Sequence, residues 1–183
     1  DGAVITPAGG APVRVSTSSF PDAAPSGLAS NGDAYLAAYT SGQGEHIFTT
    51  GLLADGSAIP PGDVELSVGE SDSFGGPAVW LGDRYGVVWQ DRRHGNYEVF
   101  FTLLNAQGDK RIPDVRISAA DGFSIYPSLG WNGSELVVVW QDERDNPGLY
   151  NVYGQVMDID GNPIGGTLAL TSDQVGFGNE APW

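Results

Sequence analysis

The stretch VVWQDRRHGN at Val87–Asn96 returns as VVWQDERDNP at Val138–Pro147, with Trp89 and Trp140 51 residues apart. In both copies an apolar run passes directly into Trp-Gln-Asp-x-Arg. A single catalytic or binding site is not normally encoded twice, whereas a repeat architecture places the same residues at a fixed period. The duplication therefore predicts a structural repeat of about 51 residues.

Four further markers recur in a constant order and with nearly this period. Short β-rich stretches end in a hydroxyl residue at Ser16, Ser67, Ser118 and Thr171. Glycine turns occur at Asp1-Gly2, Asp55-Gly56, Gln107-Gly108 and Asp160-Gly161. A second kind of turn, each followed by an apolar run, occurs at Asn31-Gly32, Gly82-Asp83 and Asn132-Gly133. A proline precedes the strand leading into that turn at Pro25, Pro77, Pro127 and Pro182. The residue types predict type I′ hairpin turns.

Each unit thus reads as strand, turn, strand, loop, strand, turn, strand, which is a four-stranded antiparallel meander. The apolar run Val137–Trp140 has no polar residue on either face, so its sheet is expected to be covered on both sides. Repeated four-stranded sheets that bury one another describe an all-β fold made of β-propeller blades. A plain β-sandwich is the alternative, but it predicts no regular period.

The strand ends and hairpins resemble those of secreted bacterial β-propeller repeat proteins, whose blades carry a W-x-D-x-R strand end and a D-x-x-G hairpin. The matching pairs are VVWQDRR with LNAQGD, and VVWQDER with MDIDGN. The resemblance covers nearly the whole chain and is architectural. It implies a secreted protein, located outside the cell, at the cell surface or in the periplasm.

The markers divide the chain into residues 1–24, 25–76, 77–126 and 127–181. The last three segments are complete blades, and the first holds the outer strand of a preceding blade at Val13–Ser16. Three blades are fewer than the four to eight of a closed ring, and open blades would expose apolar surface. We therefore expect another chain or further sequence to complete the propeller. The single outer strand favours a piece of a larger propeller over a half-ring that dimerises.

Composition excludes several classes of partner. The chain has 23 acidic and 8 basic residues, a net charge of −15. Binding of nucleic acid or of anionic membranes is not expected, because both need a basic patch. No apolar run approaches the roughly 18 residues of a membrane-spanning helix, so no membrane insertion is expected. The absence of cysteine excludes disulfides, thiolate metal sites and cysteine nucleophiles.

The repeated motif has a structural and a ligand-binding interpretation. Because side chains alternate along a strand, Trp140, Asp142 and Arg144 share one face. In the structural interpretation, the indole packs on the adjacent blade while the carboxylate and guanidinium pair at its rim. In the ligand-binding interpretation, the motif forms a repeated ligand site, which suits a lectin better than an enzyme. The same alternatives apply to the first copy, Trp89, Asp91 and Arg93.

A second candidate site lies at one rim of the blades, where the blade-to-blade loops are expected to emerge. Each of these loops carries one acid and one aromatic residue: Asp22 with Phe20, Asp72 with Phe74, Asp121 with Phe123, and Asp173 with Phe177. Carboxylates bind sugar hydroxyls or calcium, and aromatic rings stack on sugars, so the rim predicts carbohydrate binding or structural calcium. Alternatively, the phenylalanines fill gaps between blades and the acids cap turns.

The candidate metal ligands are Asp91, Asp142, His46 and His94. The two histidines are expected in loops between the second and third strands of neighbouring blades, where Asp91 or Glu98 could join them around zinc or copper. Two solvated loop histidines are the alternative interpretation.

The chain contains none of the Gly-x-Ser-x-Gly, His-Glu-x-x-His or phosphate-loop motifs. We therefore expect an extracellular binding module with a carbohydrate or protein ligand. The alternatives are a propeller hydrolase or lyase acting on polysaccharide, and a structural subunit of a surface assembly.

Overall fold

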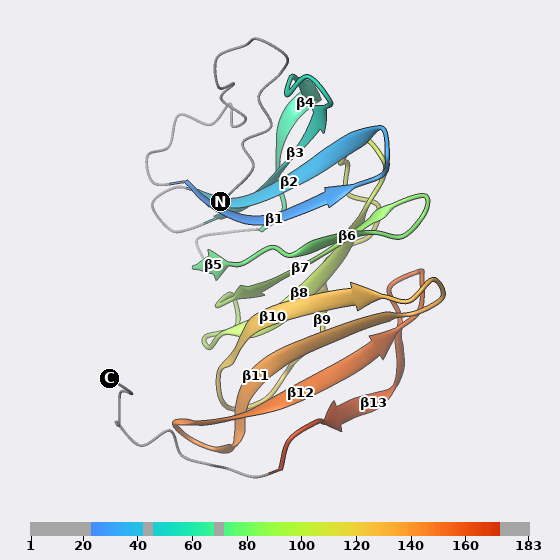
Figure 1. Cartoon of the computed structure of the whole chain (residues 1–183). Coiled ribbons are helices and arrows are strands. Elements are labelled where there is room, and N and C mark those ends of the chain that lie inside the picture. Colours follow the sequence, from blue (N-terminus) through green and yellow to red (C-terminus); the bar gives the residue numbers. More distant parts are fainter. Residues whose placement is uncertain (1–22, 42–45, 68–71, 173–183) are drawn as a thin grey trace, which may run out of the picture.

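The computed structural model describes residues 23–41, 46–67 and 72–172. In this part of the chain all regular secondary structure is β, arranged as three antiparallel sheets stacked one on another (Figure 1). The first sheet contains β1 (Ala24–Ser30), β2 (Ala34–Ser41), β3 (His46–Leu53) and β4 (Ala58–Glu65). The second contains β5 (Ser73–Phe74), β6 (Ala78–Trp80), β7 (Tyr85–Asp91), β8 (Glu98–Leu104) and β9 (Val115–Arg116). The third contains β10 (Ser124–Trp131), β11 (Leu136–Asn146), β12 (Leu149–Met157) and β13 (Pro163–Ala169).

The strand order follows the chain in every sheet, as expected for a repeated meander. In the second sheet the first strand is divided into β5 and β6, which both pair with β7. The division falls at Gly75 and Gly76, which adopt positive φ angles of 84° and 134°. Gly27 of β1 allows a close approach between the first and second sheets, since a Cβ added there would lie 2.2 Å from the carbonyl oxygen of Gly76.

Each predicted blade segment contains most of one sheet. β1 begins at Ala24 and β10 at Ser124, one and three residues before the predicted boundaries at 25 and 127. The predicted outer strand at Val13–Ser16 lies outside the described residues, as do the pairs Asp22 with Phe20 and Asp173 with Phe177.

For the described turns the prediction of type I′ is wrong, whereas the predicted turn at Asp1-Gly2 lies outside the described residues. In the β8–β9 connection, Gly108 N donates to Asn105 O at 3.0 Å and Asn105 N donates to Asp109 O at 2.8 Å. Gly108 has a φ of 95°. A type I′ turn needs a positive φ at both of its central residues, and Tyr126 is the only described non-glycine residue with a positive φ. The turn is a type I turn followed by a left-handed glycine. Asn105 Oδ1 favours it by accepting from Gln107 N at 2.9 Å.

Two apolar clusters hold the sheets together. Trp89 and Tyr85 of β7 pack with Leu36 and Ile47 of the first sheet. Trp140 of β11 packs in the cluster shared by the second and third sheets. All residues of β7 and β8 are buried, as expected for a sheet covered on both sides.

The third sheet differs from the expectation that its Val137–Trp140 run is covered on both faces. Burial alternates along β11, with Val138 and Trp140 buried and Val137 38% exposed. The described part of the chain places a neighbouring sheet on only one of its faces, the face toward the second sheet.

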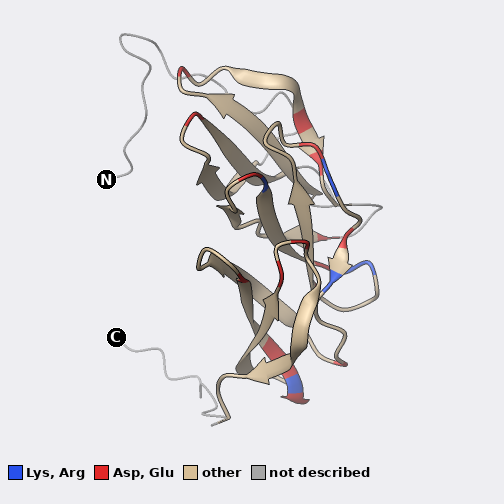
Figure 2. Ribbon diagram, turned by 90° about the vertical axis from the view of Figure 1, so that its right-hand side faces the viewer, with Lys and Arg blue, Asp and Glu red and all other residues tan. Residues whose placement is uncertain are grey.

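Acidic residues lie on turns and strand ends of all three sheets, with few basic residues among them (Figure 2). A search of the described residues finds no helix with the length and apolar character needed to span a membrane.

Candidate functional site

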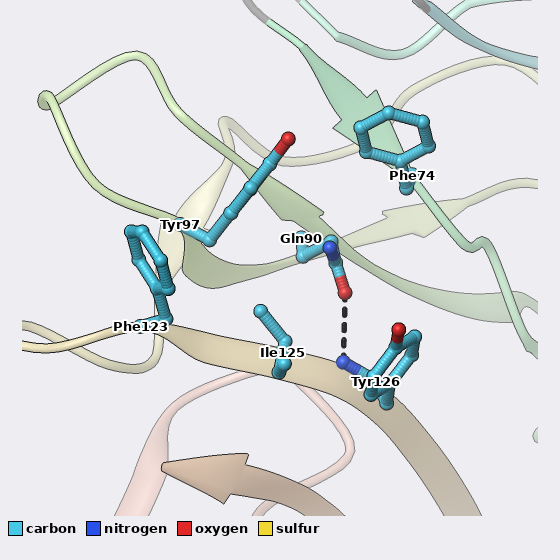
Figure 3. A pocket seen from close by; sticks show the side chains of 6 residues that line it. All are labelled: Phe74, Gln90, Tyr97, Phe123, Ile125 and Tyr126. Carbon is cyan, nitrogen blue, oxygen red and sulfur yellow. Dashed lines mark hydrogen bonds between the residues drawn. The ribbon is translucent and has the colours of Figure 1, made fainter. Parts of the chain in front are cut away.

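A pocket of about 320 Å³ opens where the second and third sheets meet. β5, β7 and β10 and the connections beside them supply its lining (Figure 3). All but one of the lining residues are aromatic or aliphatic: Phe74, Gln90, Tyr97, Phe123, Ile125 and Tyr126.

Three of the rings contact one another, with Tyr97 in the middle. Its ring centroid lies 5.9 Å from that of Phe74 and 5.7 Å from that of Phe123, with interplanar angles of 64° and 66°. Such edge-to-face pairs are a favourable arrangement of aromatic rings. The Arg92 guanidinium lies 5.2 Å from the Tyr97 centroid and pairs with Asp72 at 3.2 Å. The structure thus groups two aromatic residues predicted at this rim, Phe74 and Phe123, around Tyr97.

The remaining acid of this predicted rim, Asp121, is exposed and lies two residues before Phe123. Calcium binding by these rim acids stays a prediction.

Tyr126 stands out by its backbone and its exposure. Its φ of 52° lies in the left-handed region, which is unfavourable for a residue with a bulky side chain. Its side chain is 70% exposed. The backbone N–H donates to Oε1 of the buried Gln90 at 2.7 Å, so a residue of the second sheet holds this strained position of the third. Gly76, which also precedes a proline, occupies the corresponding place in the second sheet.

Tyr150 and Glu143 of the third sheet lie close to the residues that line the pocket. Burial and a hydrogen bond with Glu143 raise the pKa of Tyr150 to about 12, and nearby Tyr126 contributes to this shift. Glu143 Oε2 also accepts from Phe123 N at 3.1 Å. The side chain therefore connects the pocket wall to a second tyrosine.

Sequence reasoning did not single out Gln90, Tyr97, Tyr126 or Tyr150. A signal for Tyr97 was present, because in a four-stranded meander the loop between the second and third strands emerges at the same rim as the blade-to-blade loops.

The four motif residues predicted as ligand-binding lie elsewhere, within the blades. Asp91 is fully buried and accepts from Ser73 Oγ at 3.0 Å, from Arg93 N at 2.8 Å and from Arg93 Nη2 at 2.6 Å. Burial alone would raise the pKa of Asp91, but the hydrogen bonds and charge of Arg93 outweigh it and the pKa is lowered. Arg93 also pairs with Asp114 at 2.7 Å.

The second copy of the motif repeats this geometry. Asp142 is fully buried and accepts from Trp140 Nε1 at 2.7 Å, Ser124 Oγ at 2.9 Å and Arg144 Nη2 at 2.7 Å. Burial alone would raise the pKa of Asp142. The hydrogen bonds from Arg144 and Trp140 outweigh this effect, so the pKa is lowered. The Arg144 guanidinium lies 4.1 Å from the ring centroid of Tyr153. These contacts tie adjacent strands of one blade together, as the structural interpretation requires.

The candidate metal ligands are not grouped. His46 is the first residue of β3 rather than a loop residue, and its Nδ1 lies 2.8 Å from Glu65. The ring centroid of His94 lies 5.9 Å from that of Phe100, and Glu98 pairs with Arg116. Within the described ranges no three His, Cys, Asp or Glu residues form a possible metal cluster. Metal binding by His46, His94, Asp91 or Asp142 stays a prediction.

Comparison with known proteins identifies the fold. No family model matches the chain, and no curated protein matches it either. A TolB-like protein from Agrobacterium tumefaciens aligns with a TM-score of 0.53 and 18% identity, covering 84% of this chain and 50% of that one. An endo-arabinase from Bacteroides thetaiotaomicron VPI-5482 aligns with a TM-score of 0.55 and 14% identity, covering 82% and 62%.

Both neighbours are β-propeller-type folds, so the predicted all-β propeller fold is confirmed, with the described residues forming part of a propeller. The chain spans between half and two thirds of the length of these two solved structures.

Proposed function

We propose that the chain is an extracellular binding module whose rim pocket holds a sugar. The observation that carries this proposal is the convergence of Phe74, Tyr97 and Phe123 on one pocket from separate segments of two sheets. Ligand sites are concave, mostly apolar and aromatic, with a few polar groups that orient the ligand. This pocket has that composition.

The chemistry of the lining suits a carbohydrate. The C–H faces of a sugar ring are apolar and pack against aromatic rings, while its hydroxyl groups need hydrogen-bond partners. The Gln90 amide and the hydroxyl of the exposed Tyr126 supply such groups. The volume of about 320 Å³ is at the lower end of the range for small-molecule sites. One sugar unit would therefore be held in the pocket, and a longer chain would continue along the rim past Tyr150.

The charge of the protein selects among sugars. With a net charge of −15, and Asp72 and Glu143 beside the pocket, the surface repels anionic polysaccharides. The proposed ligand is a neutral sugar unit, either at the end of an oligosaccharide or within it.

Binding is tested by screening the wild-type protein against immobilised neutral glycans. The glycan that binds most tightly is then titrated by calorimetry into the wild type and into Tyr97→Ala. Removing the central ring is expected to weaken binding roughly 30-fold, the effect of losing an aromatic side chain worth about 2 kcal/mol. Leu28→Ala, which truncates an exposed apolar side chain of β1, is the matched control and should leave binding unchanged.

Unchanged affinity in Tyr97→Ala, or no binding of any neutral glycan, would refute the proposal. Release of sugar products during the titration would point instead to the hydrolase or lyase alternative.

A further inference from the structure

The third sheet repeats two of the residues with which the second sheet lines the pocket. In the second sheet, Gln90 of β7 pairs with the β8 residue that lies two positions after Tyr97. In the third sheet, Gln141 of β11 pairs with the β12 residue that lies two positions after Tyr150. By the register of the strands, Gln141 and Tyr150 therefore occupy the places of Gln90 and Tyr97.

A backbone contact at the rim supports this equivalence. Arg92 N donates to Asp72 O at 3.2 Å in the second sheet, and Glu143 N donates to Phe123 O at 3.0 Å in the third. Arg92 and Glu143 each directly follow the buried aspartate of the repeated motif. In the second sheet this charged residue contacts the tyrosine, because the Arg92 guanidinium lies 5.2 Å from the ring centroid of Tyr97. The third sheet thus has a carboxylate where the second has a cation.

Glu143 is held in a fixed position beside Tyr150. Its carboxylate accepts from the Tyr150 hydroxyl, from Phe123 N at 3.1 Å and from Gly148 N at 3.3 Å. A carboxylate has about four acceptor positions, so it can also accept from a ligand hydroxyl. The acceptor is therefore oriented by the protein before a ligand binds.

The residues of this set are open to solvent. Gln141 is exposed, and Tyr150 is 36% exposed. Among the described residues no second ring or guanidinium packs on the Tyr150 ring, whereas Tyr97 contacts two rings and Arg92. An accessible aromatic ring can pack on the apolar face of a sugar, while the amide and the carboxylate bind its hydroxyl groups.

We propose that Tyr150, Gln141 and Glu143 form a second sugar subsite, so that the ligand is a neutral oligosaccharide that spans this subsite and the pocket. The inference rests on the proposed function, because it extends the same bound sugar chain. Tyr126 connects the two places, since it lines the pocket and also contributes to the raised pKa of Tyr150. Stacked sheets lie about 10 Å apart, which sets the approximate spacing of Tyr97 and Tyr150.

The charge of the second subsite limits the sugars that it accepts. Arg92 is paired with Asp72 beside the pocket, but within the described ranges no basic side chain forms an ion pair with Glu143. An uncompensated carboxylate favours hydroxyl donors and repels carboxylated or sulfated sugars. The sugar unit over Tyr150 is therefore expected to be neutral, with a free hydroxyl facing Glu143.

The test compares affinity across oligosaccharide length. Unbranched neutral oligosaccharides of glucose, mannose, galactose and arabinose, from single sugars to hexasaccharides, are titrated into the wild type, Tyr150→Ala and Tyr150→Phe. In the wild type, affinity should rise about tenfold once the chain is long enough to reach Tyr150, as expected for one partly exposed aromatic contact. Tyr150→Ala should lose this gain and bind the single sugar as the wild type does. Tyr150→Phe keeps the ring and should retain most of the gain.

Tyr35→Ala is the matched control. Tyr35 is a half-buried tyrosine near the start of β2, at the end of that strand opposite the rim, and its removal should change no sugar affinity. Circular dichroism checks that every variant is folded.

Three results would overturn the second subsite. An affinity of the wild type that does not depend on length would do so, as would a gain that survives Tyr150→Ala. Loss of single-sugar binding in Tyr150→Ala would show instead that Tyr150 shapes the pocket. In the first two cases the pocket and the proposed function stand, whereas a wild type that bound none of these sugars would refute pocket and subsite together.

Discussion

Replacing Asp142 with alanine would test whether the Trp-x-Asp-x-Arg motif stabilises the blade. The carboxylate accepts from Trp140 Nε1 and from the hydroxyl of Ser124, and it pairs with Arg144. Without it, a buried indole N–H loses its partner, which costs about 1–3 kcal/mol. Breaking a buried ion pair costs about 3–5 kcal/mol when the other charge stays buried. The Arg144 side chain is 25% exposed and can recover some hydration, so we expect a total loss of about 3–5 kcal/mol.

Such a loss is a large part of the roughly 5–15 kcal/mol that stabilises a typical domain. For a chain of this size it corresponds to a fall in Tm of roughly 6–20 °C. Urea unfolding and calorimetry measure it directly. Asp33→Ala removes an exposed carboxylate from the β1–β2 turn and should change stability by less than about 0.5 kcal/mol. If Asp142→Ala lost less than about 1 kcal/mol, or lost sugar affinity while keeping its stability, the motif would not be the structural device described above.

Two further predictions follow from single residues. The pKa of Asp142 is lower in the folded than in the unfolded chain, so its stabilising contribution is complete above the unfolded pKa near 4 and is lost as pH falls through the folded value. The urea midpoint of the wild type should therefore fall more steeply below about pH 4 than that of Asp142→Asn, and parallel curves would contradict this assignment. Tyr126→Gly relieves the strained φ of 52° and should stabilise the fold by about 1 kcal/mol while weakening sugar binding. Unfolding and titration of the same sample test both effects, and a less stable variant would show that the tyrosine side chain supports the fold.

The predicted pairing of motif residues followed directly from strand geometry. Trp140, Asp142 and Arg144 alternate with their neighbours, so any β-strand places them on one face, and in the structure the three side chains do meet. The turn type was misjudged because residue preference alone does not separate type I′ from a type I turn with a left-handed glycine. The Asn105 side chain decides between them through its own hydrogen bond.

The pocket depended on tertiary structure in a different way. Phe74 and Phe123 were predicted at the rim, but Phe123 of the third sheet joins Phe74, Gln90 and Tyr97 of the second only because the two sheets stack in one particular register. That register results from the packing of Trp140 and its neighbours between the sheets, a contact between residues far apart in the chain.

The sequence by itself therefore determined the repeat, its period, the strand order within each blade and the side chains that share one face of each strand. These features are local, because they depend on alternation along a strand and on turn residues within a single unit. The tertiary structure alone decided which aromatic rings share a pocket and which face of the third sheet stays open. Those features depend on how separate sheets pack together, and no local pattern of residues specifies that packing.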